Sequence, residues 1–185
     1  MMYSSNVLKV VNALQITIGD QQIQKKVSCI ANEIKKCTNK GKVTAIFGNG
    51  GSAADAQHLA AELVCTYKNR QRKPYKAIAL NTDTSIMTAW SNDFDFESIF
   101  SRQLEAFGET IGFSIGLSTS GKSKNVLKAL NFSKSINLTT CLICGKNDLD
   151  YEDIDIVIKI PSEETATIQT VTQVIYHSIC DVLEN

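Results

Sequence analysis

A histidine and a glutamate that could share one metal ion or one substrate atom lie four residues apart, at His58 and Glu62. On a helix, side chains at this spacing project from the same face, one turn apart. Imidazole nitrogen and carboxylate oxygen are common zinc ligands, and both groups can transfer protons. An isolated pair of this kind is more often a buried histidine beside a solvated glutamate than a functional site. The neighbouring sequence is needed to distinguish the two.

A glycine-rich turn comes directly before this pair. The apolar run Val43–Phe47 is typical of a strand that a parallel sheet buries on both faces. Glycines in the turn 48–51 allow the backbone to bend sharply and to approach a ligand. Ser52 is the expected N-cap of the following helix, with Asp55 in its first turn. The pair therefore lies beyond the carboxyl end of a predicted parallel strand, where open α/β sheets bind ligands.

A serine-rich segment, Ser118–Ser123, follows a second apolar run and precedes a helical pattern over 124–135. Its hydroxyl groups and the free N–H groups of a helix N-terminus favour a phosphate or another anion. The alternative is a serine-rich helix cap without a ligand. We prefer the phosphate interpretation.

The pattern of apolar residues predicts an α/β protein, a doubly wound five-stranded parallel sheet with an N-terminal helical preface. The expected strands are 43–47, 76–80, 111–117, 138–144 and 154–160. Residues 5–38 form the preface, as two helices or one helix kinked near 18–20, and further helices are expected at 85–90, 96–107, 124–135 and from Thr165. We expect one domain, 1–185, made of a preface (1–40) and an α/β core (41–185).

Composition limits the class of partner. The chain has 185 residues, 43% of them apolar, which suits a single core. Nineteen basic residues balance nineteen acidic ones without a basic block, so we expect no nucleic acid and no membrane surface as partner. No apolar stretch suits a membrane span or a signal peptide, which predicts a cytoplasmic protein. The basic segment 67–75 is expected to be a solvated loop, with a cation near a phosphate pocket as the less favoured alternative.

The six cysteines, at 29, 37, 65, 141, 144 and 180, are expected to be free thiols, since a chain with a substantial core needs no disulfides. Cys141 and Cys144 have the spacing of a redox or zinc motif. They lie in an apolar run without a second pair, so we interpret them as buried strand residues.

At this point the sequence resembles a known family. The run from Gly48 to His58, with Glu62 four residues later, closely resembles the phosphoheptose isomerases, which are single sugar-isomerase (SIS) domains. Three further matches follow in the same order: Ser91–Phe94, Ser118–Ser123, and Ile168-Gln169 with His177 eight residues on. The resemblance covers nearly the whole chain.

The resemblance implies a metal-dependent isomerase that converts D-sedoheptulose 7-phosphate to D-glycero-D-manno-heptose 7-phosphate, for bacterial surface heptose synthesis. Its expected divalent metal is zinc, one per active site, with the ligands His58, Glu62, Gln169 and His177. Glu62 is the expected general base and His177 the general acid. The expected substrate-binding residues are Asn49, Gly50, Gly51, Ser52, Glu62, Asn92, Asp93, Ser118, Thr119, Ser120, Ser123 and Gln169.

Some features depart from the family or fit other functions. Thr167 and Thr170 stand where the family has arginine and glutamate, and Trp90 replaces a small residue, so the exact substrate and anomer stay open.

A non-catalytic SIS protein that binds sugar phosphates or helps to assemble replication initiators is the main alternative, and the retained His177 and Asp93 argue against it. A nicotinamide-binding fold is a weaker alternative, because the glycine spacing and the acidic residue of that fold are missing.

Helix geometry predicts that each active site is shared between subunits. Gln169 and His177 are eight residues apart, so their Cα atoms are roughly 12 Å apart along one helix. That separation is long for two ligands of one ion. Together with the family's tetrameric habit, it predicts a homo-oligomer in which one of these two residues comes from a neighbouring copy.

Overall fold

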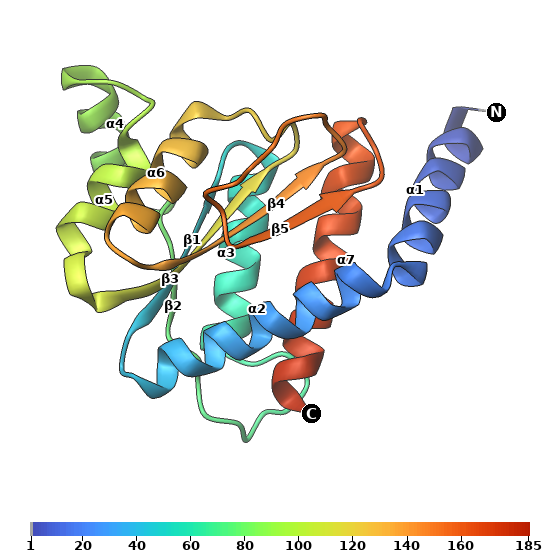
Figure 1. Ribbon diagram of the computed structural model, residues 1–185, viewed down its shortest axis with the longest axis horizontal. Helices are drawn as coiled ribbons and strands as arrows, with labels where there is room; N and C mark the ends of the chain where they lie inside the picture. The colour runs from blue at the N-terminus through green and yellow to red at the C-terminus, as the bar shows by residue number, and fades with distance from the viewer. Residues whose placement is uncertain (1) are drawn as a thin grey trace.

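Five parallel strands form the centre of the molecule, in the order β2-β1-β3-β4-β5 (Figure 1). The computed structural model describes residues 2–185, with side chains from residue 5 onward. The strands are β1 (Val43–Gly48), β2 (Ala77–Ala79), β3 (Ile111–Ser118), β4 (Thr139–Gly145) and β5 (Ile156–Ile160). The prediction of a five-stranded parallel sheet is confirmed.

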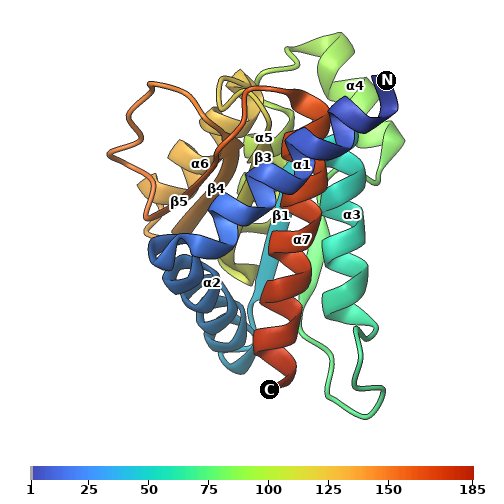
Figure 2. The same ribbon diagram turned by 90° about the vertical axis from the view of Figure 1, so that its right-hand side faces the viewer.

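Helices cover both faces of this sheet, as the two views show (Figures 1 and 2). They are α1 (Met2–Gly19), α2 (Gln21–Asn39), α3 (Gly51–Val64), α4 (Thr84–Asp93), α5 (Ile99–Phe107), the 3-10 turn η1 (Gly108–Thr110), α6 (Lys124–Ser135) and α7 (Thr165–Glu184). Helices α2, α3 and α7 share one hydrophobic core with one face of the sheet, and α5 and α6 share a second core with the other face. This burial on both faces explains why the strands are nearly continuous apolar runs.

The N-terminal preface consists of two separate helices. The carboxylate of Asp20 accepts hydrogen bonds from the N–H groups of Gln22 (2.7 Å) and Ile23 (3.3 Å), which makes it the N-cap of α2. Helix α2 packs on the sheet through its buried apolar face, whereas α1 contacts α7 and α2. Helix α2 therefore belongs to the layer that contains α3 and α7, and α1 crosses the outer side of α7 (Figure 2).

The strand order creates a crevice between β1 and β3. The chain leaves β1 through α3 toward β2 on one side, and returns through α4 and α5 to β3 on the other. Ligands of open α/β sheets bind at such a point of divergence, beyond the carboxyl ends of the strands. Gly48 is in register with Leu117 of β3. The turns 48–51 and 118–123 therefore leave the same edge of the sheet from neighbouring strands.

Two local expectations are wrong. Gly50, not Ser52, is the N-cap of α3, with φ 56° and ψ −120°, a conformation that glycine adopts without strain. Ser52 is buried inside the first turn, and Asp55 falls beyond it. Asn92 and Asp93 do not lie between two helices, because α4 continues through Asp93.

All six cysteines are free thiols, as expected. Cys141 and Cys144 are fully buried in β4, and burial raises the pKa of both thiols. They belong to the two different cores, on opposite faces of the sheet. The interpretation as buried strand residues is confirmed.

Across residues 2–185, no helix combines the length and the hydropathy that a membrane crossing requires.

Candidate active site

Two helices bring His58, Glu62 and His177 together. His58 Nε2 lies 3.1 Å from Glu62 Oε1 within α3, and the ring centroids of His58 and His177 of α7 are 5.2 Å apart. One ligand atom from each residue lies within 4.8 Å of the others. All three side chains are half-buried. Two imidazoles and a carboxylate form the donor set of a catalytic zinc site, in which a further position is left for water or substrate.

Packing of the two helices explains this convergence. The buried face of α3, with Ala56, Leu59 and Leu63, and the buried face of α7 contribute to the same core. The polar edges of both helices therefore meet beside that core. Burial and the nearby His58 lower the pKa of His177, although Glu62 opposes this. A lowered pKa favours the neutral imidazole, the form that has a lone pair for a metal ion.

Gln169, the fourth expected ligand, lies elsewhere in the same chain. Its side chain packs against Gly51 so closely that a Cβ atom added to Gly51 would lie 2.1 Å from Gln169 Nε2. Gly51 precedes His58 by seven residues on α3, which is about 10 Å along the helix. Within one chain, His177 therefore joins His58 and Glu62, whereas Gln169 faces the N-terminal end of α3.

The serine-rich segment forms a tight turn at the carboxyl end of β3. The N–H of Gly121 donates to the carbonyl of Ser118 (3.0 Å), and Gly121 has a φ of 68°. The hydroxyl of Ser118 donates to that of Ser123 (2.9 Å), which is the N-cap residue of α6 but makes no side-chain capping bond. A cavity of about 390 Å³ adjoins the turn, and its lining includes the hydroxyl groups of Thr119 and Ser120, two lysines (Lys122 and Lys146) and two acidic residues (Asp148 and Glu163). The charges that line the cavity therefore balance, and the features that suit an anion are the hydroxyl groups of the turn and the N-terminus of α6 beside it.

The amide of Asn49 connects the two turns of the crevice. Asn49 and Asn125 exchange two side-chain hydrogen bonds of 2.8 Å each. Asn125 is almost completely buried and lies in the first turn of α6. Asn125 is not among the residues predicted from the sequence, although its position just after the serine-rich segment was an available signal.

Asn92 and Asp93 stand apart from both groups. They are exposed at the end of α4, where the amide of Asn92 donates to the carboxylate of Asp93 (2.8 Å). Trp90, one turn of α4 before this end, donates from its ring nitrogen to Ser98 (2.8 Å). Among the described residues, no side-chain hydrogen bond or ion pair joins this pair to the crevice or to the three candidate ligands.

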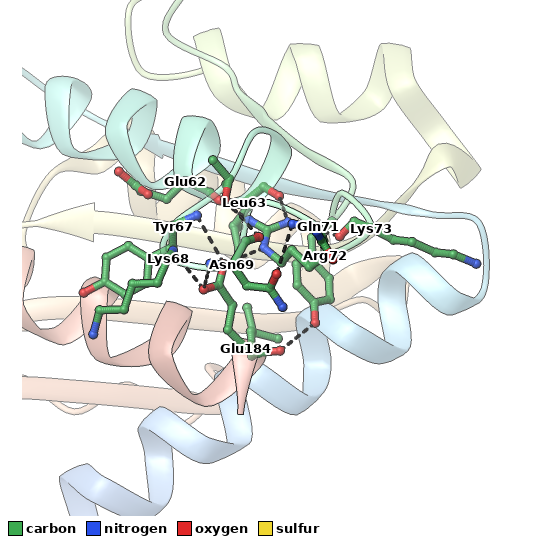
Figure 3. Close-up of polar contacts among 12 residues, drawn as sticks. Glu62, Leu63, Tyr67, Lys68, Asn69, Gln71, Arg72, Lys73 and Glu184 are labelled. Carbon is green, nitrogen blue, oxygen red and sulfur yellow. Dashed lines mark hydrogen bonds and ion pairs between the residues drawn. The ribbon is translucent and has the colours of Figure 1, made fainter.

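The basic segment after α3 is held by hydrogen bonds and an ion pair to the C-terminal ends of α3 and α7, so it is not simply a solvated loop (Figure 3). Arg72 and Glu184 form an ion pair of 2.7 Å with side chains that are only 9% and 7% exposed. Glu184 also accepts hydrogen bonds from the N–H groups of residues 67, 68 and 69. Arg72 donates to the carbonyl groups of Glu62 and Leu63 at the end of α3. The segment therefore connects the C-terminal ends of α3 and α7, and the expectation of a solvated loop is wrong for Arg72.

Two tyrosines that the sequence analysis missed contact the histidines. Tyr67, at the start of the attached segment, stacks on His177 with 5.4 Å between ring centroids. The hydroxyl of Tyr176 lies 2.8 Å from Nδ1 of His58. The position of Tyr176 directly before His177 in the sequence was the available signal.

Comparison with known proteins places this architecture in a family. The SIS domain family model matches residues 3–145. The phosphoheptose isomerase 1 of Campylobacter jejuni is 44% identical over 177 residues, covering 95% of this chain and 91% of the relative. The phosphoheptose isomerase of Geotalea daltonii is 42% identical over 165 residues, covering 89% and 85%.

Solved structures agree with this result. The structure of a phosphoheptose isomerase from Neisseria gonorrhoeae superposes with a TM-score of 0.85 at 29% identity, covering 99% of this chain and 97% of the other. The fold is thus that of an SIS domain. Within that class, the chain belongs to the phosphoheptose isomerase family.

Proposed function

We propose that the protein is a sugar-phosphate isomerase that converts D-sedoheptulose 7-phosphate to D-glycero-D-manno-heptose 7-phosphate. The observation that carries the proposal is the convergence of His58, Glu62 and His177 within 4.8 Å. The names of the relatives, phosphoheptose isomerases, support the substrate class. Heptose synthesis for the bacterial surface, in the cytoplasm, is the setting that this substrate favours. The whole of 1–185 acts as one SIS domain in this proposal.

Proton transfer between the first two carbons needs a base and an acid. Glu62 removes a proton from C1 of the ketose and returns it to C2, with an enediol between the two steps. His177 gives a proton to the C2 oxygen and accepts the proton of the C1 hydroxyl. Hydrogen and electrons balance, because the carbonyl group moves from C2 to C1 without an external oxidant.

The same residues would hold a divalent metal ion. His58, Glu62 and His177 fit zinc as two nitrogen donors and one oxygen donor, and Gln169 is the proposed fourth ligand. When bound, the ion supplies a Lewis acid that polarises the carbonyl group and stabilises the charge of the enediolate.

The crevice residues bind and orient the sugar phosphate in this proposal. The phosphate is assigned to Ser52, Ser118, Thr119, Ser120 and Ser123. Asn49, Gly50, Gly51, Asn92 and Asp93 are assigned to the sugar chain. Fixed binding of the remote phosphate would position C1 and C2 and lower the entropic part of the barrier.

A homotetramer with shared active sites completes the proposal. The crevice and Gln169 lie about two helical turns from the three candidate ligands in one chain, so a second copy is needed to bring both groups together. Exposed apolar side chains on α1 and α7 offer contacts for such a copy. They include Val7, Leu8, Val11, Val174 and Val182. A closed symmetric assembly would bury these surfaces.

The test is turnover of D-sedoheptulose 7-phosphate, followed by NMR of the aldose with and without a chelator. Glu62→Gln and His177→Ala should each abolish turnover and leave the fold intact, because each removes a proton-transfer group and a metal ligand. Glu105→Gln, which changes an exposed glutamate that pairs with Arg102, is the matched control. Normal rates in either active-site variant would refute the assignment.

A further inference from the structure

The ring of His177 is oriented by neighbouring rings. His58 has a hydrogen-bonding neighbour at each ring nitrogen, the hydroxyl of Tyr176 and the carboxylate of Glu62. Among the residues whose side chains the structure describes, none forms a hydrogen bond or an ion pair with the ring of His177. Rotation of an imidazole about its Cβ–Cγ bond has no sharp preference, so packing has to orient the ring. Tyr67 supplies this packing, since its ring stacks on His177 with 24° between the two planes.

Tyr67 lies outside the helices, so its own position needs support. The backbone N–H groups of residues 67, 68 and 69 all donate to the carboxylate of Glu184, at 3.2, 2.9 and 2.8 Å. Successive N–H groups that surround one carboxylate form an anion-binding nest. Lys68 adds a side-chain contact, because its Nζ lies 4.9 Å from the centre of the Tyr67 ring and 2.6 Å from Asp181 of α7. The last turn of α7 thus fixes the backbone of Tyr67 itself.

Arg72 connects the same carboxylate to the other helix of the site (Figure 3). Its Nε atom lies 2.7 Å from Glu184 Oε1, in an ion pair that is almost completely buried. Its guanidinium group also donates to the carbonyl of Leu63 (2.9 Å) and to that of Glu62, in the last turn of α3. Removing one partner of a buried ion pair leaves the other charge unpaired, which costs free energy. One carboxylate and one guanidinium group therefore hold the ends of α3 and α7 together.

We propose that the segment 67–75, anchored by Glu184 and Arg72, holds Tyr67 against His177 and so makes Tyr67 a positioning residue for the His177 imidazole. With its ring held, His177 faces the other two candidate ligands, and the ligand atoms of all three lie within 4.8 Å of one another. The inference deepens the proposed function and rests on the roles given there to His177.

A purely space-filling role for Tyr67 makes a different prediction. A half-buried tyrosine that only covered apolar surface could be replaced by leucine with little effect. A stacked ring needs another flat ring in its place, because the contact depends on the parallel arrangement of two π-systems. Comparison of Tyr67→Phe with Tyr67→Leu therefore separates the two roles.

The mobility of the His177 ring can be measured in protein from which metal has been removed by a chelator. Carbon-13 relaxation of the ring Cε1–H groups gives an order parameter for each imidazole, and the chain has only two histidines, so His177→Ala assigns the signals. We expect a rigid His177 ring in the unmodified protein and in Tyr67→Phe, and a clearly lower order parameter in Tyr67→Leu. His58 is the internal control and should change little, because its hydrogen bonds remain.

Zinc affinity and kinetics test the consequence for the site. Competition with a chelating indicator should show a zinc dissociation constant about 10 times higher for Tyr67→Leu, as when a group that orients a metal ligand is lost. At saturating zinc, kcat for D-sedoheptulose 7-phosphate should fall with KM unchanged, because the phosphate is assigned to the crevice. Tyr67→Phe should restore both quantities. Phe107→Leu, which removes a partly exposed ring at the end of α5, is the matched control and should have no effect.

The anchor is tested by combining variants. Glu184→Gln keeps the ring of Tyr67 but weakens the bonds to residues 67–69 and to Arg72. It should lower the order parameter of His177 and the zinc affinity, less strongly than Tyr67→Leu. In the double variant both quantities should equal those of Tyr67→Leu alone, since the two changes act through one contact. Circular dichroism would check the fold of each variant.

The outcomes separate this inference from the proposed function. An unchanged order parameter of His177 in Tyr67→Leu would overturn the inference, as would additive losses in the double variant. If the unmodified protein neither binds zinc nor converts the sugar phosphate, the proposed function is refuted. A lower order parameter of His177 in Tyr67→Leu would then still support the role of Tyr67, and an unchanged one would overturn it.

Discussion

At the scale of single residues, Gly51 provides the space that the side chain of Gln169 occupies. A Cβ atom at this position would meet three atoms of the Gln169 amide within 3.1 Å. Since these atoms belong to the end of a flexible side chain, Gly51→Ala should displace Gln169 without unfolding the protein. We expect turnover of the sugar phosphate to fall at least 10-fold, with an unchanged circular dichroism spectrum.

Gly19→Ala is the control for this variant, because nothing lies within 4 Å of the corresponding Cβ atom at the end of α1. If Gly51→Ala were as active as this control, Gln169 would have no role that depends on its observed position.

The serine-rich turn allows a second test at this scale. Ser120→Ala and Ser123→Ala should each raise KM for the sugar phosphate about 5- to 10-fold, since each removes about 1 kcal/mol of hydrogen bonding to the phosphate, or somewhat more if the bond is charged. Ser135→Ala, at the other end of α6, should leave KM unchanged, because its exposed hydroxyl only bonds the carbonyl of Phe132. Steady-state kinetics would decide, and an unaltered KM in both turn variants would place the phosphate elsewhere.

At the scale of secondary-structure elements, the segment between α3 and β2 depends on one ionised carboxylate. Burial opposes ionisation of Glu184, but hydrogen bonds from Arg72 and from three backbone N–H groups outweigh it and lower its pKa to about 2. The usual value is 4.5. Because the folded state has the lower pKa, the unfolded state binds more protons between these values. This contribution to stability is present above about pH 4.5 and is lost as the pH falls toward about 2.

Glu184→Gln should therefore be less stable than the unmodified protein at neutral pH, and this difference should shrink as the pH falls through the same window. Glu97→Gln, which affects an exposed pair with Lys124, should show almost no difference at any pH. Urea unfolding at several pH values measures the free energy of unfolding of both variants and of the unmodified protein. A difference for Glu184→Gln that is independent of pH would mean that the charge of Glu184 does not stabilise the segment.

The sequence predicts the elements well and their long-range contacts poorly. Apolar runs and helical spacing depend on neighbouring residues, which is why all five strands and the helical preface were predicted, although the sequence left open whether the preface is two helices or one kinked helix. The pairing of Arg72 with Glu184 joins residues 112 positions apart and has no local pattern. The sequence predicted Ser52 as the N-cap of α3 because serine is a common N-cap residue. The N-cap is Gly50, and its backbone conformation is visible only in the structure.

The same distinction applies to the candidate site. Spacing on one helix pairs His58 with Glu62, and the structure brings His177 to them from α7. Spacing alone also predicts that Gln169 and His177 of one chain do not share an ion, and this stays a prediction. Tyr176 was missed because a tyrosine within an apolar helical pattern is usually a core residue, and its hydroxyl contact with His58 requires the packing of α3 on α7.

At the scale of the whole molecule, shared sites predict that two inactive variants can restore each other. Gln169→Ala and His177→Ala change different groups, which lie about two turns apart in one chain and would meet across subunits. After mixing, unfolding and refolding together, some sites of the hybrid oligomers should contain both unmodified residues. We expect the mixture to regain a substantial fraction of normal turnover, with size-exclusion chromatography and light scattering showing a tetramer.

Mixtures of each variant with itself are the control and should stay inactive. An inactive hybrid, or a fully active monomer, would show that a single chain builds its whole active site.

Cys141 and Cys144 lie on opposite faces of β4, so the reactivity of their thiols can report on the opening of the two cores separately. One thiol is buried in the core of α2, α3 and α7, and the other in the core of α5 and α6. In a protein whose exposed Cys29 and Cys65 are replaced by serine, the reaction of each thiol with a labelling reagent reports how often its own core opens. Cys141 and Cys144 of one strand thus report separately on the opening rates of the two cores.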